Sequence, residues 1–173
     1  MHIVLHQPEI PQNTGNIGRT CVATNTSLHL IEPLGFSINE KALKRAGMDY
    51  WPKLDVTKYI DYEDFKAKHP GAKIWYATTK AKHSYTDVSF GMDDFIMFGK
   101  ESAGIPEEIL EADKEHCIRI PMLKEERSLN LSNSAAIILY EALRQIKFVG
   151  LETQGHMHRI FAGLETQGHM HRI

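Results

Sequence analysis

Short apolar runs and amphipathic stretches alternate along most of the chain. The apolar runs are rich in Ile, Val and aromatic residues, which favours strands at 2–6, 27–32, 72–78, 94–99 and 116–122. Stretches with helical spacing lie at 14–25, 39–48, 61–69, 105–114 and 131–148. Pro106 suits the first position of the fourth helix. This alternation predicts an α/β fold with a mostly parallel sheet covered on both faces, in which ligands bind beyond the carboxyl ends of the strands.

The last amphipathic stretch carries one continuous apolar stripe, which predicts a helix that faces the core. The stripe consists of Leu131, Ala135, Ile138, Leu139, Ala142, Leu143 and Ile146. No proline-rich linker and no shift in composition precedes residue 149. We therefore expect residues 1–149 to form one domain.

The last 24 residues contain the same eleven-residue string twice. GLETQGHMHRI occupies 150–160 and recurs unchanged at 163–173. Structural repeats diverge and need several copies to bury a core, so we interpret 150–173 as a polar tail that arose by duplication or was added for expression. The alternating histidines of this tail could capture stray metal, but they predict no physiological metal site. These histidines are His156, His158, His169 and His171.

Composition narrows the class of protein further. The chain has 173 residues, of which 42% are hydrophobic and 24% charged, as in an average soluble globular protein. The formal net charge of −2 gives no overall basic field, so a nucleic-acid partner has to be held locally. Cys21 and Cys117 form no Cys-x-x-Cys pattern, which excludes a disulfide framework or zinc site and favours a reducing cytoplasm. No apolar run approaches the ~20 residues of a membrane span, so we expect no membrane partner.

Loops rich in Gly, Asn and Ser follow three of the predicted strands. The first, at 11–20, reads PQNTGNIGRT and leads into a helix. Gly15 and Gly18 allow close backbone approach, and a helix N-terminus with Arg19 nearby suits a phosphate or another anion. The alternative interpretation is a turn, a helix cap and a surface arginine.

The second and third loops add further polar groups. The second, FGKESAGIP at 98–106, is neither a Walker A loop nor part of a Gly-x-Gly-x-x-Gly motif, which disfavours phosphate-loop NTPases and Rossmann dehydrogenases. Its Glu101 could instead favour a helix N-terminus through the helix dipole. The third, RSLNLSN at 127–133, opens the last helix with four small polar residues, more than capping requires.

Taken together, the strings PQNTGNIGR, FGKESAGIP and IPM…RSLNLSNSAAIILYEALRQ resemble the three motifs of the SPOUT superfamily of RNA methyltransferases, in the same order and spacing. The chain is most similar to the minimal TrmL/YibK-type branch, the tRNA (cytidine/uridine 34) 2'-O-methyltransferases, from about residue 2 to 148. HLIEPLGF and KRAGMDYW also resemble that branch. The resemblance implies a parallel sheet flanked by helices, with a C-terminal deep trefoil knot, an exception to unknotted topology.

The resemblance also implies an activity and its partners. The expected reaction is S-adenosyl-L-methionine-dependent 2'-O-methylation of the wobble nucleotide of tRNA, either C34 or a modified U34. The expected partners are the anticodon stem-loop of tRNA and a second copy of the chain, since such proteins complete the active site as a homodimer. The alternatives are the same chemistry on another RNA, or a non-catalytic RNA-binding module.

Site residues are implied position by position. Several cofactor-binding residues would act through backbone groups; the set is Ala77, Thr78, Gly99, Gly104, Ile120, Met122, Ser128 and Leu129. The catalytic set is Arg19, Asn13, Glu101, Asn130 and Tyr140, with no metal. Because a guanidinium stays protonated, we expect Arg19 to bind phosphate and stabilise the developing alkoxide, and the proton acceptor stays open. For Tyr140 the alternative is simple packing among its apolar neighbours.

Other polar residues predict less. Two local groups of basic residues could contact the tRNA backbone or simply be solvated. The first consists of Lys41, Lys44 and Arg45, and the second of Lys80 and Lys82. The scattered histidines are assigned no chemistry; they are His2, His6, His29, His69, His83 and His116.

Overall fold

A seven-stranded sheet organises the computed structural model, which describes residues 1–45 and 47–157. Its strands are β1 (His2–His6), β2 (Ser27–Ile31), β3 (Val56–Tyr59), β4 (Ile74–Ala77), β5 (His83–Ser84), β6 (Phe95–Phe98) and β7 (Cys117–Arg119). They are arranged in the order β3-β2-β1-β6-β4-β7-β5, and every adjacent pair is parallel. The predicted α/β fold with a parallel sheet is confirmed.

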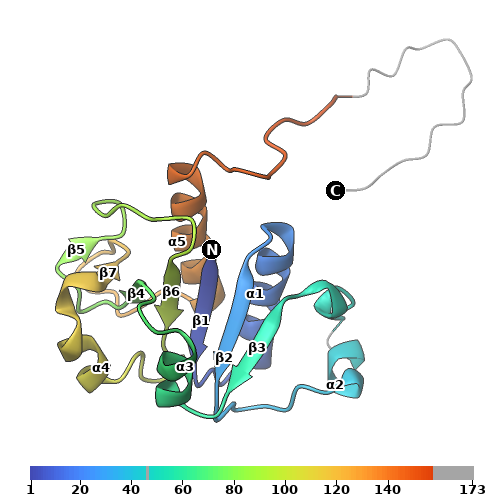
Figure 1. Cartoon of the computed structure of the whole chain (residues 1–173), viewed down its shortest axis with the longest axis horizontal. Coiled ribbons are helices and arrows are strands. Elements are labelled where there is room, and N and C mark those ends of the chain that lie inside the picture. The colour runs from blue at the N-terminus through green and yellow to red at the C-terminus, as the bar shows by residue number, and fades with distance from the viewer. Residues whose placement is uncertain (46, 158–173) are drawn as a thin grey trace, which may run out of the picture.

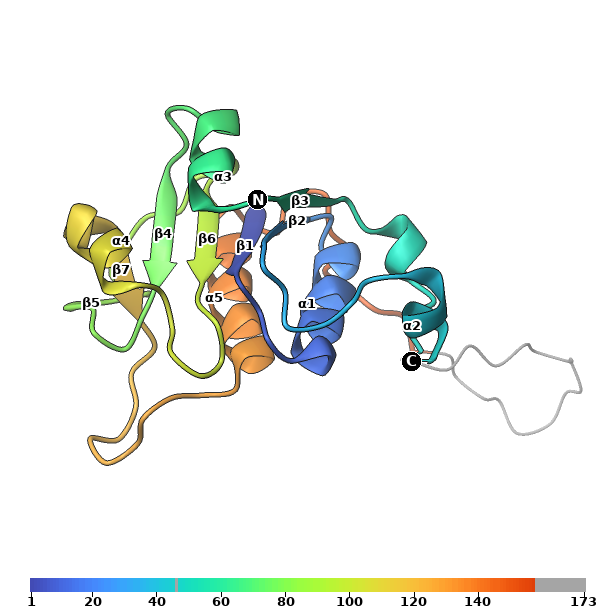
Figure 2. The ribbon, with the colours of Figure 1, turned by 90° about the horizontal axis from the view of Figure 1, so that it is seen from below.

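Helices cover both faces of this sheet (Figure 1). The helices of the described residues are α1 (Pro11–Ala23), α2 (Glu40–Arg45), α3 (Tyr62–Lys68), α4 (Glu107–Ala112) and α5 (Leu131–Gln145), with short 3₁₀ turns η1 (Trp51–Lys53) and η2 (Lys114–His116). Helices α1 and α5 contact each other and pack on one face, as the view turned by 90° shows (Figure 2). Helices α3 and α4 pack on the other face. The central strand β1 is therefore buried on both sides, which explains its uninterrupted apolar run.

The predicted stripe on α5 faces the core. Ala135, Ile138, Leu139, Ala142 and Leu143 are buried, and Leu131 and Ile146 pack partly buried against them. The helix itself ends at Gln145, three residues before the predicted end. Lys147 and Phe148 then adopt positive φ angles, which are incompatible with a right-handed α-helix.

Several other boundaries differ from the prediction. Helix α1 begins at Pro11 rather than residue 14, because proline fits the first turn of a helix. Pro106 precedes α4 as its N-cap and is not its first helical residue. Strand β7 ends at Arg119, well before the predicted residue 122, and Pro121 lacks the N–H that a continued strand would need.

Two edge strands, β3 and β5, were missed by the pattern of apolar runs. Thr57 and Lys58 in the middle of β3 are exposed, and β5 has only two residues, His83 and Ser84. An edge strand is covered by fewer neighbours, so its composition is closer to that of a loop. None of the helices in residues 1–45 and 47–157 has the length and hydropathy that a membrane crossing requires.

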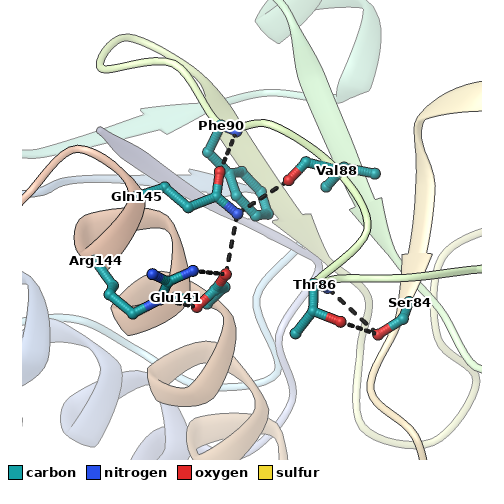
Figure 3. Close-up of polar contacts among 7 residues, drawn as sticks. All are labelled: Ser84, Thr86, Val88, Phe90, Glu141, Arg144 and Gln145. Atoms are coloured by element: carbon teal, nitrogen blue, oxygen red, sulfur yellow. Dashed lines mark hydrogen bonds and ion pairs between the residues drawn. The ribbon is translucent and has the colours of Figure 1, made fainter.

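Gln145 fastens the end of α5 to the segment between β5 and β6 (Figure 3). Its Oε1 accepts a hydrogen bond from the backbone N–H of Phe90 at 2.8 Å, and its Nε2 donates to the carbonyl of Val88 at 3.0 Å. Nε2 also donates to Glu141, which pairs with Arg144 at 2.8 and 2.9 Å. Hydrogen bonds from Arg144 and Gln145 lower the pKa of Glu141 to about 2. One amide therefore satisfies two backbone groups of the loop.

Replacing Gln145 by leucine is expected to lower the free energy of unfolding by about 1–3 kcal/mol, because the Phe90 N–H and the Val88 carbonyl lose their partner. Urea denaturation measures this change. The matched control, Arg144→Gln, removes an exposed ion pair from the same cluster and should cost less than about 1 kcal/mol. Equal losses in the two variants would contradict this account of the loop.

Three histidines and a tyrosine form a hydrogen-bonded chain across β1, β2, β3 and α3. His2 Nδ1 lies 2.9 Å from His29 Nε2, and His29 Nδ1 lies 2.7 Å from the Tyr59 hydroxyl. That hydroxyl lies 2.7 Å from Nε2 of His69, which directly follows α3. Burial, followed by the neighbouring His2 and His69, lowers the pKa of His29 to about 3. Burial therefore keeps His29 neutral in the folded protein.

The pKa of His29 predicts an acid-labile fold. The unfolded chain binds a proton at His29 near pH 6.5 and the folded chain does not, so stability is complete above that pH and falls as the pH drops. We expect His29 alone to account for a loss of about 2 kcal/mol at pH 5. Urea denaturation of the wild type and of His29→Phe at pH 7.5 and pH 5 measures it. The variant should show a smaller fall, and an identical fall in both proteins would contradict the assignment.

Candidate active site

A cavity of about 500 Å³ opens at the carboxyl ends of β4, β6 and β7. Its walls come from the ends of these strands, the segments that follow them and the first two turns of α5. In Figure 2 the chain between β7 and α5 loops out beyond these strand ends. The cavity therefore lies where a parallel α/β sheet binds its ligands, and its size is typical of a small-molecule site.

Most residues predicted for the site line this cavity. All eight residues expected to bind the cofactor do so: Ala77, Thr78, Gly99, Gly104, Ile120, Met122, Ser128 and Leu129. Three of the five expected catalytic residues join them: Asn13, Glu101 and Asn130. Arg19 and Tyr140 are not among the lining residues.

The loop after β6 is a tight turn that requires glycine at two positions. Gly104 has a φ of +72° and donates its N–H to the carbonyl of Lys100 at 2.8 Å. A Cβ at Gly99 would overlap the backbone of Gly104 and Ile105, and backbone cannot move aside cheaply. The cavity wall at Gly99 and Gly104 is consequently backbone, which a ligand can approach closely.

Apolar side chains form another part of the cavity wall. Ile118 and Ile120 line the cavity from β7 and the residues after it, and Leu129, Leu131 and Ile138 line it from the α5 side. Backbone polar groups on one side and branched apolar side chains on the other suit a ligand with a flat, partly apolar ring and several hydrogen-bonding groups. S-adenosyl-L-methionine, with its adenine, ribose and amino-acid parts, fits this description.

A chain of hydrogen bonds joins the three predicted motifs. Glu101 accepts from the backbone N–H of Glu9 at 2.8 Å, from that of Ile10 at 3.1 Å and from Asn13 Nδ2 at 3.2 Å. Asn13 Oδ1 in turn accepts from Asn130 Nδ2 at 3.1 Å. The segment before α1, the loop after β6 and the start of α5 are thus fixed relative to one another.

Glu101 acts as a cap for a helix that lies far from it in the sequence. Ile10, the N-cap of α1, provides no side-chain cap, and the Glu101 carboxylate accepts from its N–H instead. The sequence suggested that Glu101 could interact favourably with a helix N-terminus, and in the structure Glu101 makes such a contact with α1. Glu9 makes a reciprocal contact: its carboxylate accepts hydrogen bonds from Ser102 N at 3.1 Å and from Ser102 Oγ at 2.8 Å.

Capping explains more of the third motif than the sequence indicated. Asn130 Oδ1 accepts from the backbone N–H groups of Ser132 and Asn133 and from the Ser132 hydroxyl. The Ser134 hydroxyl donates to the Asn130 carbonyl at 3.0 Å. Ser128, by contrast, is an exposed lining residue of the cavity.

Arg19 lies on a different side of α1 from Asn13. Six residues separate them, which corresponds to about 9 Å along the helix and about 240° around it. The Arg19 side chain is exposed, and its guanidinium carbon lies 5.9 Å from the centre of the Tyr50 ring. The cavity and Arg19 therefore lie apart within one chain.

Tyr140 projects outward from α5. It is 47% exposed, so it is not enclosed in the core of its own chain. Ile137 on the same side of the helix is 37% exposed, which is high for a branched apolar residue. This outward strip belongs to a helix that is packed against α1, the helix that carries Arg19.

The two basic groups lie in different places. Lys80 lines the cavity and forms an ion pair with Glu107, whereas Lys82 is exposed beside it. Lys41 and Arg45 are exposed on α2, and the side chain of Lys44 lies outside the described part of the chain. Sequence reasoning missed Lys100 and Arg127, two further cationic residues of the cavity lining. Their position within or beside the quoted motifs is the signal that would have found them.

A parallel α/β sheet with a glycine-walled cavity at its carboxyl edge defines a protein that binds a small ligand through three linked loops. The chain belongs to the SpoU rRNA Methylase family, whose profile matches residues 1–140. This membership confirms the resemblance to the SPOUT RNA methyltransferases that the three motifs indicated.

Individual relatives are similar over nearly their whole length. The tRNA (cytidine(34)-2'-O)-methyltransferase of Methylovorus glucosotrophus is 48% identical over 149 residues, 86% of this chain and 97% of the relative. A Listeria innocua protein that carries this name provisionally is 52% identical over 153 residues, 87% of this chain and 90% of the relative. A solved structure described as giving insights into the 2-OH methylation of C/U34 on tRNA superimposes with a TM-score of 0.79 at 43% identity, covering 84% of this chain and 95% of that one.

Proposed function

We propose that this protein is an S-adenosyl-L-methionine-dependent methyltransferase that methylates the 2'-hydroxyl of the wobble nucleotide of tRNA, C34 or a modified U34. The observation that carries the proposal is the cavity at the carboxyl edge of the sheet, built from all three SPOUT-like motifs. The names of the similar proteins supply the substrate class.

The cofactor is assigned to this cavity. Ala77, Thr78, Ile120, Met122 and Leu129 would surround its apolar parts, while the backbone at Gly99 and Gly104 would meet its polar groups. When bound, S-adenosyl-L-methionine supplies an electrophilic methyl group on a sulfonium centre. No residue of this cavity is assigned to a metal, and the described residues contain no cluster of three potential metal ligands.

The chain itself contributes positioning and charge. The Glu101–Asn13–Asn130 chain of hydrogen bonds fixes the three loops, so that a ribose is held at a constant place relative to the cofactor. Arg19 binds a substrate phosphate and stabilises the oxyanion that develops at the 2'-oxygen. Since a guanidinium remains protonated, this role is electrostatic and includes no proton removal.

A homodimer would unite these groups. Arg19 and Tyr140 are exposed on α1 and α5, which lie against each other, and the exposed Ile137 adds apolar surface. A second copy on this face would bring Arg19 and Tyr140 of one chain to the cavity of the other. The proposal is supported by the position of both residues outside the lining of their own chain's cavity. Light scattering of the purified protein tests the dimer directly.

The remaining assignments follow from this function. Residues 1–149 form the catalytic domain, and the segment from β7 into α5 forms a deep trefoil knot with the loop after β6, whose residues line the same cavity. The protein works in the cytoplasm on the anticodon stem-loop of tRNA. The exposed Lys41, Arg45 and Lys82 are available for contacts with the RNA backbone.

The proposal is tested by transfer of labelled methyl from S-adenosyl-L-methionine to bulk tRNA and, separately, to rRNA, followed by mass spectrometry of the digested product. The expected product is a 2'-O-methylated nucleoside from tRNA only. Transfer to rRNA would reassign the substrate. Cofactor binding without transfer to either RNA would favour a non-catalytic RNA-binding protein.

A further inference from the structure

The segment between α2 and β3 packs closely on the outward face of α1. Residues 48–54 form a compact turn, in which the N–H groups of Trp51, Lys53 and Leu54 donate to the carbonyls of Met48, Tyr50 and Trp51. Gly18 of α1 receives this turn: a Cβ there would lie 3.2 Å from both Trp51 and Leu54. The absence of a side chain at Gly18 therefore permits the turn to lie directly on the helix.

Tyr50 is attached to the same helix through its hydroxyl. This hydroxyl donates to the carbonyl of Gly15, and a Cβ at Gly15 would come within 3.5 Å of it and would overlap the end of Met48. Both ends of the Tyr50 side chain are consequently fixed, its backbone by the turn and its hydroxyl by α1. Partial burial raises the pKa of Tyr50, so the hydroxyl stays a hydrogen-bond donor at neutral pH.

Arg19 directly follows Gly18 and extends over the fixed ring. Its guanidinium carbon lies 5.9 Å from the ring centre, within the range of a cation–π contact. An exposed arginine otherwise samples many rotamers. The conformational entropy that it loses when it binds a substrate weakens that binding. A ring held in place on α1 reduces the number of rotamers before the substrate arrives.

We propose that Tyr50 is a positioning residue for Arg19, holding the guanidinium in the orientation in which it meets the substrate phosphate and the reacting ribose. The inference rests on the proposed function of Arg19 and adds to it a residue outside the three motifs. The hydrogen bond from the Tyr50 hydroxyl to Gly15 fixes the position of the ring along α1, and the ring orients the Arg19 guanidinium.

A double-mutant cycle tests this role. Tyr50→Leu is expected to lower kcat for methyl transfer about three- to fivefold, the size of an exposed cation–π contact, with the KM for S-adenosyl-L-methionine unchanged. Tyr50→Phe keeps the ring but loses the hydroxyl that attaches it to Gly15, so its kcat should lie between those of the wild type and Tyr50→Leu. In an Arg19→Ala background, Tyr50→Leu should change kcat by less than about twofold, because two residues that act together are not additive.

A second measurement uses RNA binding without cofactor. Tyr50→Leu should weaken binding of an anticodon stem-loop in the wild-type background and leave it unchanged in the Arg19→Ala background. Equal losses in both backgrounds, or equal losses in Tyr50→Leu and Tyr50→Phe, would overturn the inference and leave Tyr50 as a packing residue. If the wild type itself transfers no methyl to tRNA, the proposed function fails, and the binding cycle still decides whether Tyr50 acts through Arg19.

Discussion

Replacing Arg19 by alanine is expected to lower kcat for tRNA methylation by about 10²- to 10³-fold, the effect of removing one group that stabilises an oxyanion. The free energy of unfolding should fall by less than about 1 kcal/mol, because the side chain is exposed and loses an exposed cation–π contact with Tyr50. Cofactor affinity should stay unchanged, because Arg19 does not line the cavity of its own chain. Single-turnover methylation, urea denaturation and cofactor titration measure the three quantities.

Arg19→Lys is the matched variant for this prediction. Lysine keeps the positive charge but lacks the planar fork that meets a phosphate with two hydrogen bonds, so it should restore only part of the lost rate. An Arg19→Ala variant with wild-type turnover would show that the arginine is a surface residue, the alternative already recognised in the sequence.

Glu101→Ala is expected to have the largest effect on the architecture of the site. Its carboxylate accepts three hydrogen bonds, from Glu9 N, Ile10 N and Asn13 Nδ2. Losing a charged acceptor for these donors should reduce the free energy of unfolding by about 2–3 kcal/mol. Because the loop after β6 also lines the cavity, cofactor affinity should fall together with stability. Denaturation and calorimetric titration of one preparation compare the two.

Two further variants make this prediction specific. Glu101→Gln keeps one acceptor oxygen and should lose about half as much stability. Glu107 lies a few residues after Glu101 and forms an exposed ion pair with Lys80. Glu107→Gln removes this pair and should cost less than about 1 kcal/mol. If Glu101→Ala were as stable as the wild type but failed to transfer methyl, Glu101 would contact the substrate and would not hold the loops together.

The central part of the fold could be predicted from the sequence because its strands are buried on both faces. The apolar runs of β1 and β6 have no polar interruption, that of β2 is interrupted by the buried His29, and each strand appears near its predicted place. The edge strand β3 could not be found in this way, because Thr57 and Lys58 face solvent and break the run.

The cavity lining was predicted and the contacts within it were not. Glycines and small polar residues at strand ends mark a loop site, and the family resemblance assigned them to a cofactor. The bond between Glu101 and Glu9 spans 92 residues, and no local pattern specifies such a pair. The outward direction of Arg19 likewise depends on how α1 is rotated against the sheet, which is set by the tertiary packing of its buried residues, Ile17 and Cys21 among them.

Methylation of a synthetic anticodon stem-loop tests the central claim most directly. Two substrates are compared under single-turnover conditions, one with a 2'-deoxynucleotide at position 34 and one with it at position 32. The account predicts that transfer is lost with the first substrate and retained with the second. Transfer that persists when the 2'-hydroxyl of nucleotide 34 is missing would place the methyl group elsewhere and contradict the account.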